Sequence, residues 1–497
     1  MKTCRCFGRM VSNPSPVSPS RVRRARRWWG LLFAAVLVWG LGCSETVEEP
    51  DRDPDAEAGE SDEPPPNSVM PGLDGVADAM VALTARRWEG PRVRWPREAE
   101  RPSADRSLRS MNAPLAVHGD VSPERLQAVL EALEGVAAYV HAGGFARPFP
   151  DGSLGGGPAF DLYLAPTDRL VDVRPDRPLG WSFLDGVTAH ALLDPGVPLS
   201  DLEPCLAQAY GEAIALEQDP AEAPGWHRAL GAFLAWQYTG RFGCADAIDR
   251  QQSPEGLPWV GHGEHASADH GAAGGLLLAM VSQRHDGGDG AFVRELYQLA
   301  RQRTWEGSDL RAAPDLWQAL ERSVELGGDR FESMMEDFTV VRGFLGARDE
   351  HSPMQALRGL GPGASAPIVF EVALADLPHH TPPGPELQTY GTVFALVDVR
   401  GAPSQSRLRV WLRGEYGVEW GLTGSRLDAS GRELARLSAP PRRHDRRSYL
   451  PVELTPDTTH VLVGITNLSH RLPDDDGPDS NGRGFRLIFD VVGEGEE

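Results

Sequence analysis

The spacing of apolar residues predicts helices and strands in the first two thirds of the chain. In VSPERLQAVLEALEGVAAYVHAGG apolar side chains recur every three or four residues, Ser122 can cap the amino end, and Gly143 follows as a stop, which predicts a helix between them. Short apolar runs at 160–164 and 189–193 predict strands. Helical spacing then returns at 204–217, 224–240 and about 271–284, 290–303, 313–325 and 329–344.

Beyond about residue 360 the spacing changes from helical to alternate residues. Segments such as TVFALVDV, RLRVWLRG and FRLIFDVV alternate or run apolar between turns rich in Gly, Pro and Asp. This series predicts an antiparallel β-sandwich domain over residues 362–494, after a mixed strand and helix domain at 71–350. The fold class predicted for the chain is therefore α+β.

The first 43 residues follow neither pattern. Arginines at 21–27 precede WWGLLFAAVLVWGLGC, whose apolar stretch of about 14 residues is too short to cross a bilayer comfortably and is typical of a signal peptide. The ending GLGC resembles the lipobox of bacterial lipoproteins, in which the cysteine, here Cys43, is lipidated, although Gly40 stands where leucine is usual. A plain secretory signal and an uncleaved anchor are the alternatives. Residues 44–70 are acidic and proline-rich, which predicts a disordered tether.

The net charge excludes one class of partner, and the lipobox indicates a location. Without residues 1–42, which carry eight Lys and Arg and no acid, the formal net charge of −22 would become −30. Such a surface repels nucleic acid and anionic lipid headgroups, so we expect no nucleic-acid partner and membrane contact through the lipid anchor alone. The resemblance to lipoproteins implies the cell envelope. It favours the outer membrane over the inner one, because Ser44 is not the aspartate that retains lipoproteins inside.

The helix predicted at 204–217 carries polar residues where a zinc peptidase carries its ligands. A zincin helix needs two histidines four residues apart, with a glutamate beside the first as general base. The strand ALLDP, the helix containing CLAQAYGEA, the helix WHRALGAFLAW and the terminal strands resemble, in that order, the edge strand, active-site helix, second helix and β-sandwich of secreted bacterial gluzincin-type metallopeptidases. The resemblance implies a gluzincin-like domain in which Gln208, Ala209, Glu212 and Ala229 stand in place of His, Glu, His and Glu.

None of these four positions keeps the residue type that zinc-dependent hydrolysis needs. Gln208 and Glu212 could hold a hard cation weakly but not tetrahedral zinc, and Ala209 cannot accept a proton. The resemblance thus implies a pseudopeptidase without a cofactor, which binds or scaffolds a protein or peptide in the former substrate cleft. An ordinary amphipathic helix, with an apolar stripe from Leu206 to Ile214, explains the same segment without a peptidase ancestor.

A histidine cluster supplies the competing hypothesis of an active enzyme. His262, His265 and His270 lie close together in GHGEHASADHG, and neutral imidazole is the commonest metal ligand, so a metal-dependent hydrolase using them is the alternative function. Their spacing matches no closed zinc pattern, and an exposed loop before the next helix explains it more simply. A solvated turn likewise explains the acidic segment 472–482, for which calcium binding is the alternative. A solvated loop explains the basic segment 440–447, for which binding of an acidic partner is the alternative.

Cys205 and Cys244 are predicted to form a disulfide bond. The helices at 204–217 and 224–240 are joined by a short turn and should form an antiparallel hairpin. Cys205 begins the first helix and Cys244 follows the second, which puts both at the same end of the hairpin. In an oxidising compartment we expect a disulfide between them.

Overall fold

The computed structural model describes residues 92–94, 100–178, 186–222, 224–244, 268–301, 309–311, 316–352, 354–359, 365–387, 390–403, 405–439, 447–468 and 482–493. All of them belong to one compact unit, residues 70–497. The expected signal peptide with Cys43, the expected tether, His262, His265, and the segments 440–446 and 472–481 lie outside the described residues. Within the described ranges, no helix is long and apolar enough to cross a membrane.

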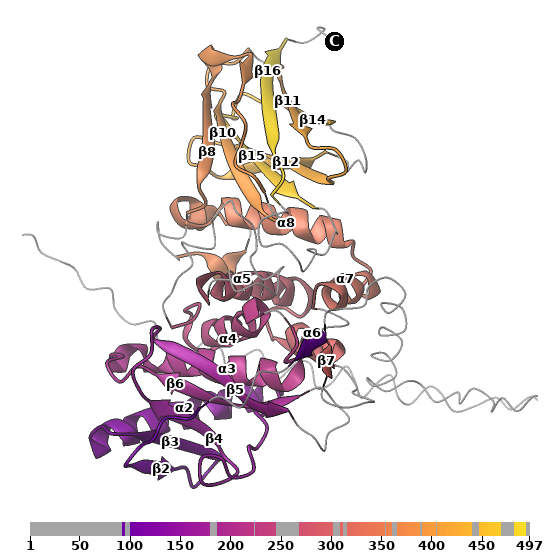
Figure 1. The fold of residues 1–497 in the computed structure, drawn as a ribbon. Helices are drawn as coiled ribbons and strands as arrows, with labels where there is room; N and C mark the ends of the chain where they lie inside the picture. The colour runs from indigo at the N-terminus through magenta and orange to yellow at the C-terminus, as the bar shows by residue number, and fades with distance from the viewer. Residues whose placement is uncertain are drawn as a thin grey trace, which may run out of the picture. The chain divides into compact units, whose positions relative to one another are not determined.

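A five-stranded mixed sheet forms the amino-terminal part of this unit (Figure 1). Its strands, in spatial order, are β2 (Ser107–Arg109), β3 (Leu115–Gly119), β4 (Phe160–Leu164), β6 (Val187–Leu193) and β5 (Val171–Pro178). β3, β4 and β6 are parallel, whereas β2 and β5 run antiparallel at the two edges. The predicted strands at 160–164 and 189–193 are confirmed. The interpretation of ALLDP as an edge strand is wrong, because β5 pairs with the outer side of β6.

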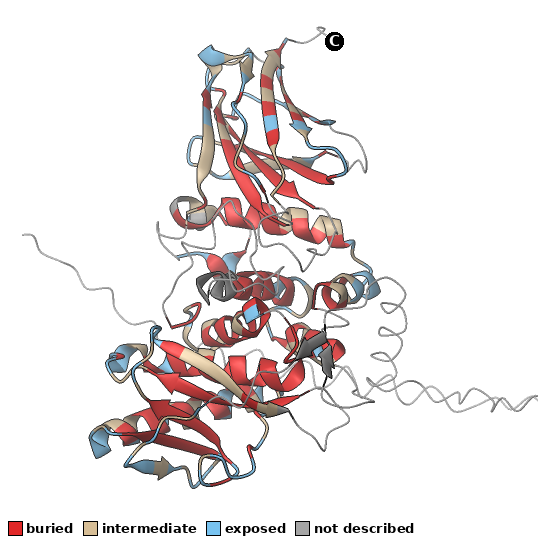
Figure 2. Ribbon diagram, in the orientation of Figure 1, coloured by how far each residue is buried: buried red, intermediate tan, exposed pale blue. Residues whose placement is uncertain are grey.

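Side chains alternate along these strands, so the sheet has two chemically different faces. Leu162 and Leu164 of β4 and Ala191 of β6 enter the hydrophobic core. Asp161, which precedes Leu162, and His190, which precedes Ala191, must then point to the opposite face, because successive side chains of a strand point to opposite sides. Both faces are buried along the three central strands β3, β4 and β6, which are red in Figure 2.

The helix predicted between Ser122 and Gly143 is α2 (Pro123–Ala142). Ser122 accepts a hydrogen bond from the backbone N–H of Arg125, and Pro123 occupies the first turn, where a helix can do without its N–H. The apolar positions that predicted this helix are all buried, and they join the core of the first sheet. α2 therefore covers the apolar face of that sheet.

Three further helices pack in succession on the same core. α3 (Leu202–Gln218) contacts β5 and β6, α4 (Pro224–Thr239) packs on α3, and α5 (Ala268–His285) packs on α4. A Cβ on Gly211 would lie 2.7 Å from the Cα of Gly231, and a Cβ on Gly275 would lie 2.8 Å from the Cβ of Ala232. The three helices approach this closely because their contact points lack side chains.

The predicted disulfide closes the open end of the α3–α4 hairpin. Cys205 and Cys244 are bonded, with their Cα atoms 4.0 Å apart and a sequence separation of 39. α4 ends before Gly240, whose φ of 80° lies in the left-handed region that glycine adopts at helix ends. The chain can thereby turn and bring Cys244 to the start of α3.

The remaining helices of this part are α6 (Ala291–Ala300), α7 (Leu316–Leu326) and α8 (Phe331–Gly343), and they match the predicted positions. β1 (Arg92–Arg94) and β7 (Asp309–Arg311), which lie far apart in the sequence, form a short antiparallel pair.

Two sheets form the carboxy-terminal part, and their buried side chains share one hydrophobic cluster. The five-stranded sheet contains, in spatial order, β13 (Glu433–Ser438), β12 (Trp420–Leu427), β15 (His460–Asn467), β10 (Thr392–Asp398) and β8 (Ile368–Ala373). The four-stranded sheet contains β14 (Arg447–Glu453), β11 (Arg407–Gly414), β16 (Phe485–Val492) and β9 (His379–His380). The strands are antiparallel except that β8 and β10 are parallel, so the expectation of a purely antiparallel arrangement is wrong for that pair.

α8 joins the helical part to the five-stranded sheet. Val340 of α8 and Phe344, the residue after α8, form a separate buried cluster with Phe394 of β10 and Leu462 of β15. Beside it, the hydroxyl oxygens of Thr339 and Thr466 lie 2.7 Å apart. The described chain mixes helices and several sheets, and its fold class is α+β, as predicted from the sequence.

Candidate functional site

Nearly every side chain of α3 is buried, so a simple amphipathic stripe does not describe this helix. Between Pro204 and Gln218 the one residue that is only half-buried is Gln208. A helix that is covered on all sides belongs to the interior of its domain. Gln208, at the position implied for the first zinc ligand, is therefore the point where solvent comes nearest to the middle of α3.

Gln208 and Glu212 lie on one face of α3 and are hydrogen-bonded to each other. The Nε2 of Gln208 donates to Oε1 of Glu212 at 2.8 Å. The Oε1 of Gln208 accepts the backbone N–H of Cys244 at 2.7 Å. Both ends of the amide are thus engaged, and one of them holds the residue that the disulfide ties to α3.

Three elements converge on the carboxyl of Glu212. Burial raises the pKa of Glu212, while the cation of Arg228 on α4 and the hydrogen bond from Gln208 act in the opposite direction. Asp172 of β5 and Arg169, two residues before β5, also influence this pKa. Glu212 therefore lies where α3, α4 and the edge strand meet, and α4 brings an arginine cation to it.

Ala209 and Ala229, the other two implied positions, are fully buried in the apolar core. α3 and α4 are in close contact in this region, since a Cβ on Gly231 would lie 2.5 Å from the Gln208 carbonyl oxygen and 2.9 Å from Cγ of Glu212. A carboxylate at either alanine would need a partner to offset the loss of its hydration. The structure thus brings Gln208 and Glu212 into contact and leaves both alanines as packing residues.

The structure does not place the imidazoles of the competing site. His270 belongs to α5, but its side chain, like the whole of His262 and His265, lies outside the described residues. Among the residues that are described, no group of three or more His, Cys, Asp and Glu side chains is placed to hold a metal ion. Cys205 and Cys244 are bonded to each other and so supply no thiolate.

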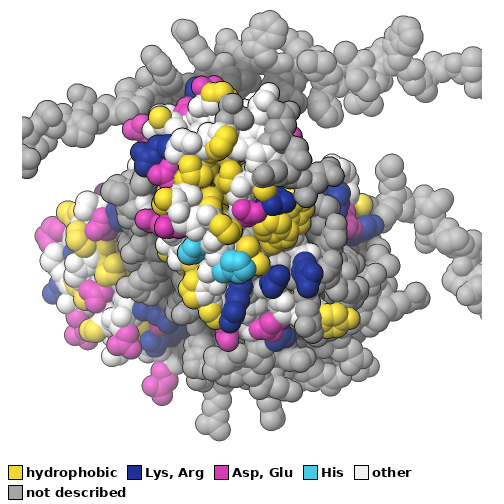
Figure 3. All heavy atoms as spheres, turned by 90° about the horizontal axis from the view of Figure 1, so that it is seen from above, with side chains coloured by type: hydrophobic (Ala, Val, Ile, Leu, Met, Phe, Trp, Pro, Cys, Tyr) yellow, Lys and Arg dark blue, Asp and Glu magenta, His cyan; other side chains and the backbone are white. Residues whose placement is uncertain are grey.

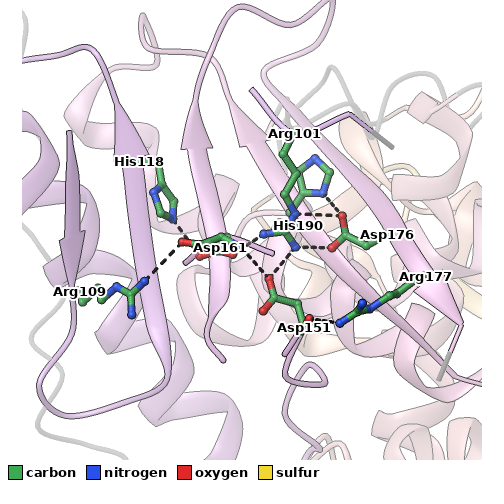
Figure 4. A network of polar contacts seen from close by, with 9 residues as sticks. Arg101, Arg109, His118, Asp151, Asp161, Asp176, Arg177 and His190 are labelled. Carbon is green, nitrogen blue, oxygen red and sulfur yellow. Dashed lines mark hydrogen bonds and ion pairs between the residues drawn. The ribbon is translucent and has the colours of Figure 1, made fainter. Parts of the chain in front are cut away.

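A network of buried charges, which the sequence did not predict, lies on the polar face of the first sheet (Figure 4). Its centre is Arg101, which forms ion pairs with three carboxylates. Arg101 Nη2 lies 2.8 Å from Asp151 Oδ2, and its guanidinium also hydrogen-bonds to Asp161 of β4 and Asp176 of β5. One cation from the segment before β2 thus connects two strands and the loop before β4.

Two histidines complete this network. His118 Nε2 lies 2.8 Å from Asp161 Oδ1, and His190 Nδ1 lies 2.7 Å from Asp176 Oδ1. Burial opposes ionisation of both aspartates, but the hydrogen bonds from their histidines, together with other contacts in the network, outweigh it and lower the pKa of each carboxyl. In Figure 4 the two histidines come from different strands, on either side of Asp161.

Asp151 behaves differently from the other two aspartates. Burial and a hydrogen bond with Asp161 raise the pKa of Asp151 to about 6, although Arg101 favours its ionised form. Below about pH 6 Asp151 is therefore the partner that carries a proton, and it donates that proton to Asp161.

The side chains of this network are buried, which limits the access of a substrate to them. Asp151, Asp161, Asp176 and His190 are at most 1% exposed, and His118 is 7% exposed. Gly155 sits directly over Asp161, because a Cβ there would overlap the carboxylate. The arrangement fastens the segment around Arg101 and the loop before β4 to the sheet, but it presents little surface to a substrate.

One sequence signal could have revealed part of this network. Asp161 is the second residue of FDLYL, and His190 is the second residue of AHALL, so each is a polar residue within an apolar strand. A buried polar residue needs a partner, which indicates a second polar residue on a neighbouring strand. No local signal connects them to Arg101, which is 60 residues from Asp161.

Comparisons with known proteins do not assign this chain to a family. No protein-family model and no curated protein matches the chain. Among solved structures it is similar, at 11% identity and a TM-score of 0.17, to the enzymatically active domain of tailspike protein 4 of bacteriophage CBA120, over 22% of this chain and 15% of that one. It is also similar, at 12% identity and a TM-score of 0.13, to a Cry1Da tryptic core variant of Bacillus thuringiensis, over 26% of each chain. Both TM-scores are too low to support an argument about fold or function.

Proposed function

We propose that this chain is a bacterial envelope lipoprotein whose helical part is a degenerate gluzincin-type metallopeptidase domain that binds or scaffolds a partner. The observation that carries the proposal is the junction of α3, α4 and β5 around Glu212. A zincin site needs two positions four residues apart on one helix face, and Gln208 and Glu212 occupy such positions and touch. The second helix of the implied site, α4, packs directly on them.

The order of elements supports the same ancestry. A strand leads into α3, α3 lies beside the edge strand β5, and α4 returns along α3 as a hairpin. Two sheets with a shared core follow at the carboxy-terminal end, and we interpret them as the β-sandwich of the implied architecture.

The chemistry of the junction supports binding rather than hydrolysis. Ala209, in the place of the general base, has no group that accepts a proton. Gln208 uses its amide oxygen on the backbone of Cys244, and Glu212 takes a hydrogen bond from Gln208 and lies near the Arg228 cation. These contacts satisfy within the protein the polar atoms that a peptidase would direct at zinc and water.

A peptide or protein is the partner that this proposal favours. The edge strand β5 lies next to α3, and an edge strand can pair with an extended peptide through its backbone. The lipid on Cys43 and the acidic tether would hold this domain away from the outer membrane, where it could meet such a partner.

Metal analysis of the purified full-length chain tests the loss of catalysis. We expect no stoichiometric zinc and no hydrolysis of unfolded casein. Zinc at one equivalent, lost on His262→Ala or His265→Ala, would contradict the pseudopeptidase. Casein hydrolysis lost in the same variants would establish the metal-dependent hydrolase.

A gain of zinc binding tests the ancestry. The double variant Gln208→His with Glu212→His puts two imidazoles four residues apart on α3, and we expect it to bind zinc where the parent chain does not. The matched variant Gln208→Ala with Glu212→Ala should bind none. If the folded histidine variant binds zinc no better than the alanine variant, the two positions do not form a metal-site geometry and the ancestry is refuted.

Membrane fractionation tests the anchor separately. The parent chain should remain with the membrane fraction, and Cys43→Ser should release it or leave it with an uncleaved signal. Membrane attachment with normal processing in Cys43→Ser would contradict lipidation of this residue.

A further inference from the structure

The four-stranded sheet of the carboxy-terminal part has one buried and one outward face. Along β11, Leu408, Val410 and Leu412 are buried in the core, and the residues between them are exposed or half-buried. β14 and β16 largely alternate in the same way. The outward side chains of these strands therefore form one surface, which we call the β11 face; it comprises Arg407, Arg409, Trp411, Arg413, Arg447, Tyr449, Pro451, Glu453, Arg486, Ile488, Asp490 and His380.

A row of large side chains crosses this face. The strand register places Trp411 opposite Tyr449 on one side and opposite Ile488 on the other, and Ile488 is opposite His380. The rings of Trp411 and Tyr449 are 5.4 Å apart at an interplanar angle of 34°, and Tyr449 is 40% exposed. Tyr449 thus offers a ring to solvent, and Trp411 supports it.

Neighbouring charges hold this aromatic pair in place. The guanidinium of Arg409 lies 5.2 Å from the ring centroid of Trp411, and Asp490 fixes Arg409 at 2.8 Å. The chain Asp490–Arg409–Trp411–Tyr449 is therefore ordered before any ligand arrives, which reduces the entropy lost on binding.

A row of arginines lies beside the aromatic row. Arg413 is opposite Arg447 on one neighbouring strand and opposite Arg486 on the other. Like charges placed directly opposite each other destabilise a sheet. Among the described residues Arg413 and Arg486 have no ion pair, whereas Arg407 lies 3.3 Å from Glu453. This row leaves positive charge exposed on a chain whose formal net charge is −22.

From this arrangement we infer that the β11 face binds an acidic polysaccharide. A sugar ring would stack on Tyr449, because the C–H face of a pyranose is apolar and fits an aromatic ring. Carboxylates of the same strand would pair with Arg413 and Arg486, whose planar guanidinium groups match the geometry of a carboxylate. Seen from above in Figure 3, hydrophobic side chains lie next to Lys, Arg and His side chains at that end of the molecule.

The same geometry disfavours two other anionic partners. A peptide cannot add to this face as a strand, because the backbone of β11 is already paired with β14 and β16. Large, highly exposed aliphatic side chains, which would insert into a bilayer, occur elsewhere, at Leu199 and Leu326, and not on this face. This binding site does not depend on the proposed function of α3, and either proposal can fail without the other.

Binding of the full-length chain to polygalacturonate, measured by affinity electrophoresis, tests the inference. We expect the polymer to retard the chain, and neutral dextran to have no effect. The variant Arg413→Ala with Arg486→Ala should weaken binding about tenfold, since two partly screened charge contacts are lost. Tyr449→Ala should weaken it about fivefold through the lost stacking. Raising the salt concentration should weaken binding of the parent chain but hardly affect the double variant.

Control variants and competing ligands make the result decisive. Arg322→Ala removes an exposed arginine on α7 and should leave binding unchanged. The inference is overturned if the parent chain does not bind the polymer, or if Arg322→Ala weakens binding as much as the double variant does. It is also overturned if polyaspartate or vesicles containing anionic lipid bind more tightly than the polymer through the same arginines, which would assign the face to a peptide or a membrane.

Discussion

Asp151→Asn should make the first sheet less sensitive to pH. In the network around Arg101, burial and the hydrogen bond with Asp161 raise the pKa of Asp151 from 3.8 to about 6. The folded protein therefore binds this proton more tightly than the unfolded chain does, and the sheet loses stability as the pH rises from about 4 to about 6. The difference between the two pKa values corresponds to about 3 kcal/mol.

Asparagine copies the protonated form of Asp151, because its amide can donate to Asp161 as the carboxylic acid does. It cannot ionise, so it avoids the loss of stability at higher pH. The stability of Asp151→Asn relative to the parent chain should rise by up to about 3 kcal/mol between pH 4 and pH 7. Asp161 and Asp176 have lowered pKa values, and the stability that they contribute is lost only as the pH falls below about 4, outside this window.

Hydrogen exchange measured by mass spectrometry on peptides from β4 tests this directly, because it reports the opening of the sheet even if other parts unfold separately. After correction for intrinsic exchange rates, the difference in opening free energy between variant and parent should follow the titration of Asp151. Asp168→Asn is the matched control, since Asp168 is exposed and should show no such difference. A difference that is constant between pH 4 and pH 7, or that falls with pH, would refute the assignment of the proton to Asp151.

Three further predictions concern stability. Arg101→Met removes the cation from three buried carboxylates, so it should lower the free energy of unfolding by roughly 3–5 kcal/mol near pH 7. A urea midpoint equal to that of the parent chain would contradict the network. Replacing Cys205 and Cys244 by serine should lower the free energy of unfolding by about 3–4 kcal/mol, measured by urea unfolding without reductant. A gain in stability would contradict a stabilising disulfide. Gly231→Ala should lower the free energy of unfolding by about 1–3 kcal/mol, because the new Cβ would lie 2.5 Å from the Gln208 carbonyl oxygen. Gly493→Ala, with nothing within 4 Å of the new Cβ, should have no effect.

Local patterns predicted the elements that are long or strongly periodic. α2 follows its apolar spacing and its Ser122 cap, and α3 and α4 follow theirs. β5 was missed because VDVRPDRP contains two prolines, which argue against a strand, yet an edge strand tolerates proline. β3 was missed because LAVHG is too short to show a period of its own.

The sequence predicted which residues occupy the candidate site, but not which other residues they contact. The sequence shows that Gln208 and Glu212 are four residues apart on a helix, which places them on one face. It does not show that Gln208 also binds the backbone of Cys244, because that contact depends on where the disulfide holds the end of α4. The apolar stripe of α3 predicted a single buried face for a similar reason. α4 and the first sheet cover further faces of α3, and the sequence of α3 alone does not show which faces they cover.

The α+β class, the helical and alternating segments and the acidic net charge could be predicted because they depend on nearby residues or on composition alone. The pairing of Cys205 with Cys244, 39 residues apart, could be predicted because a short turn makes α3 and α4 a hairpin. Tertiary structure alone decided that Arg101 meets Asp176, and that Tyr449, Trp411 and Ile488 form one row. Strand register and the packing of distant segments set these contacts, and a shift of one residue would send each outward side chain to the opposite face.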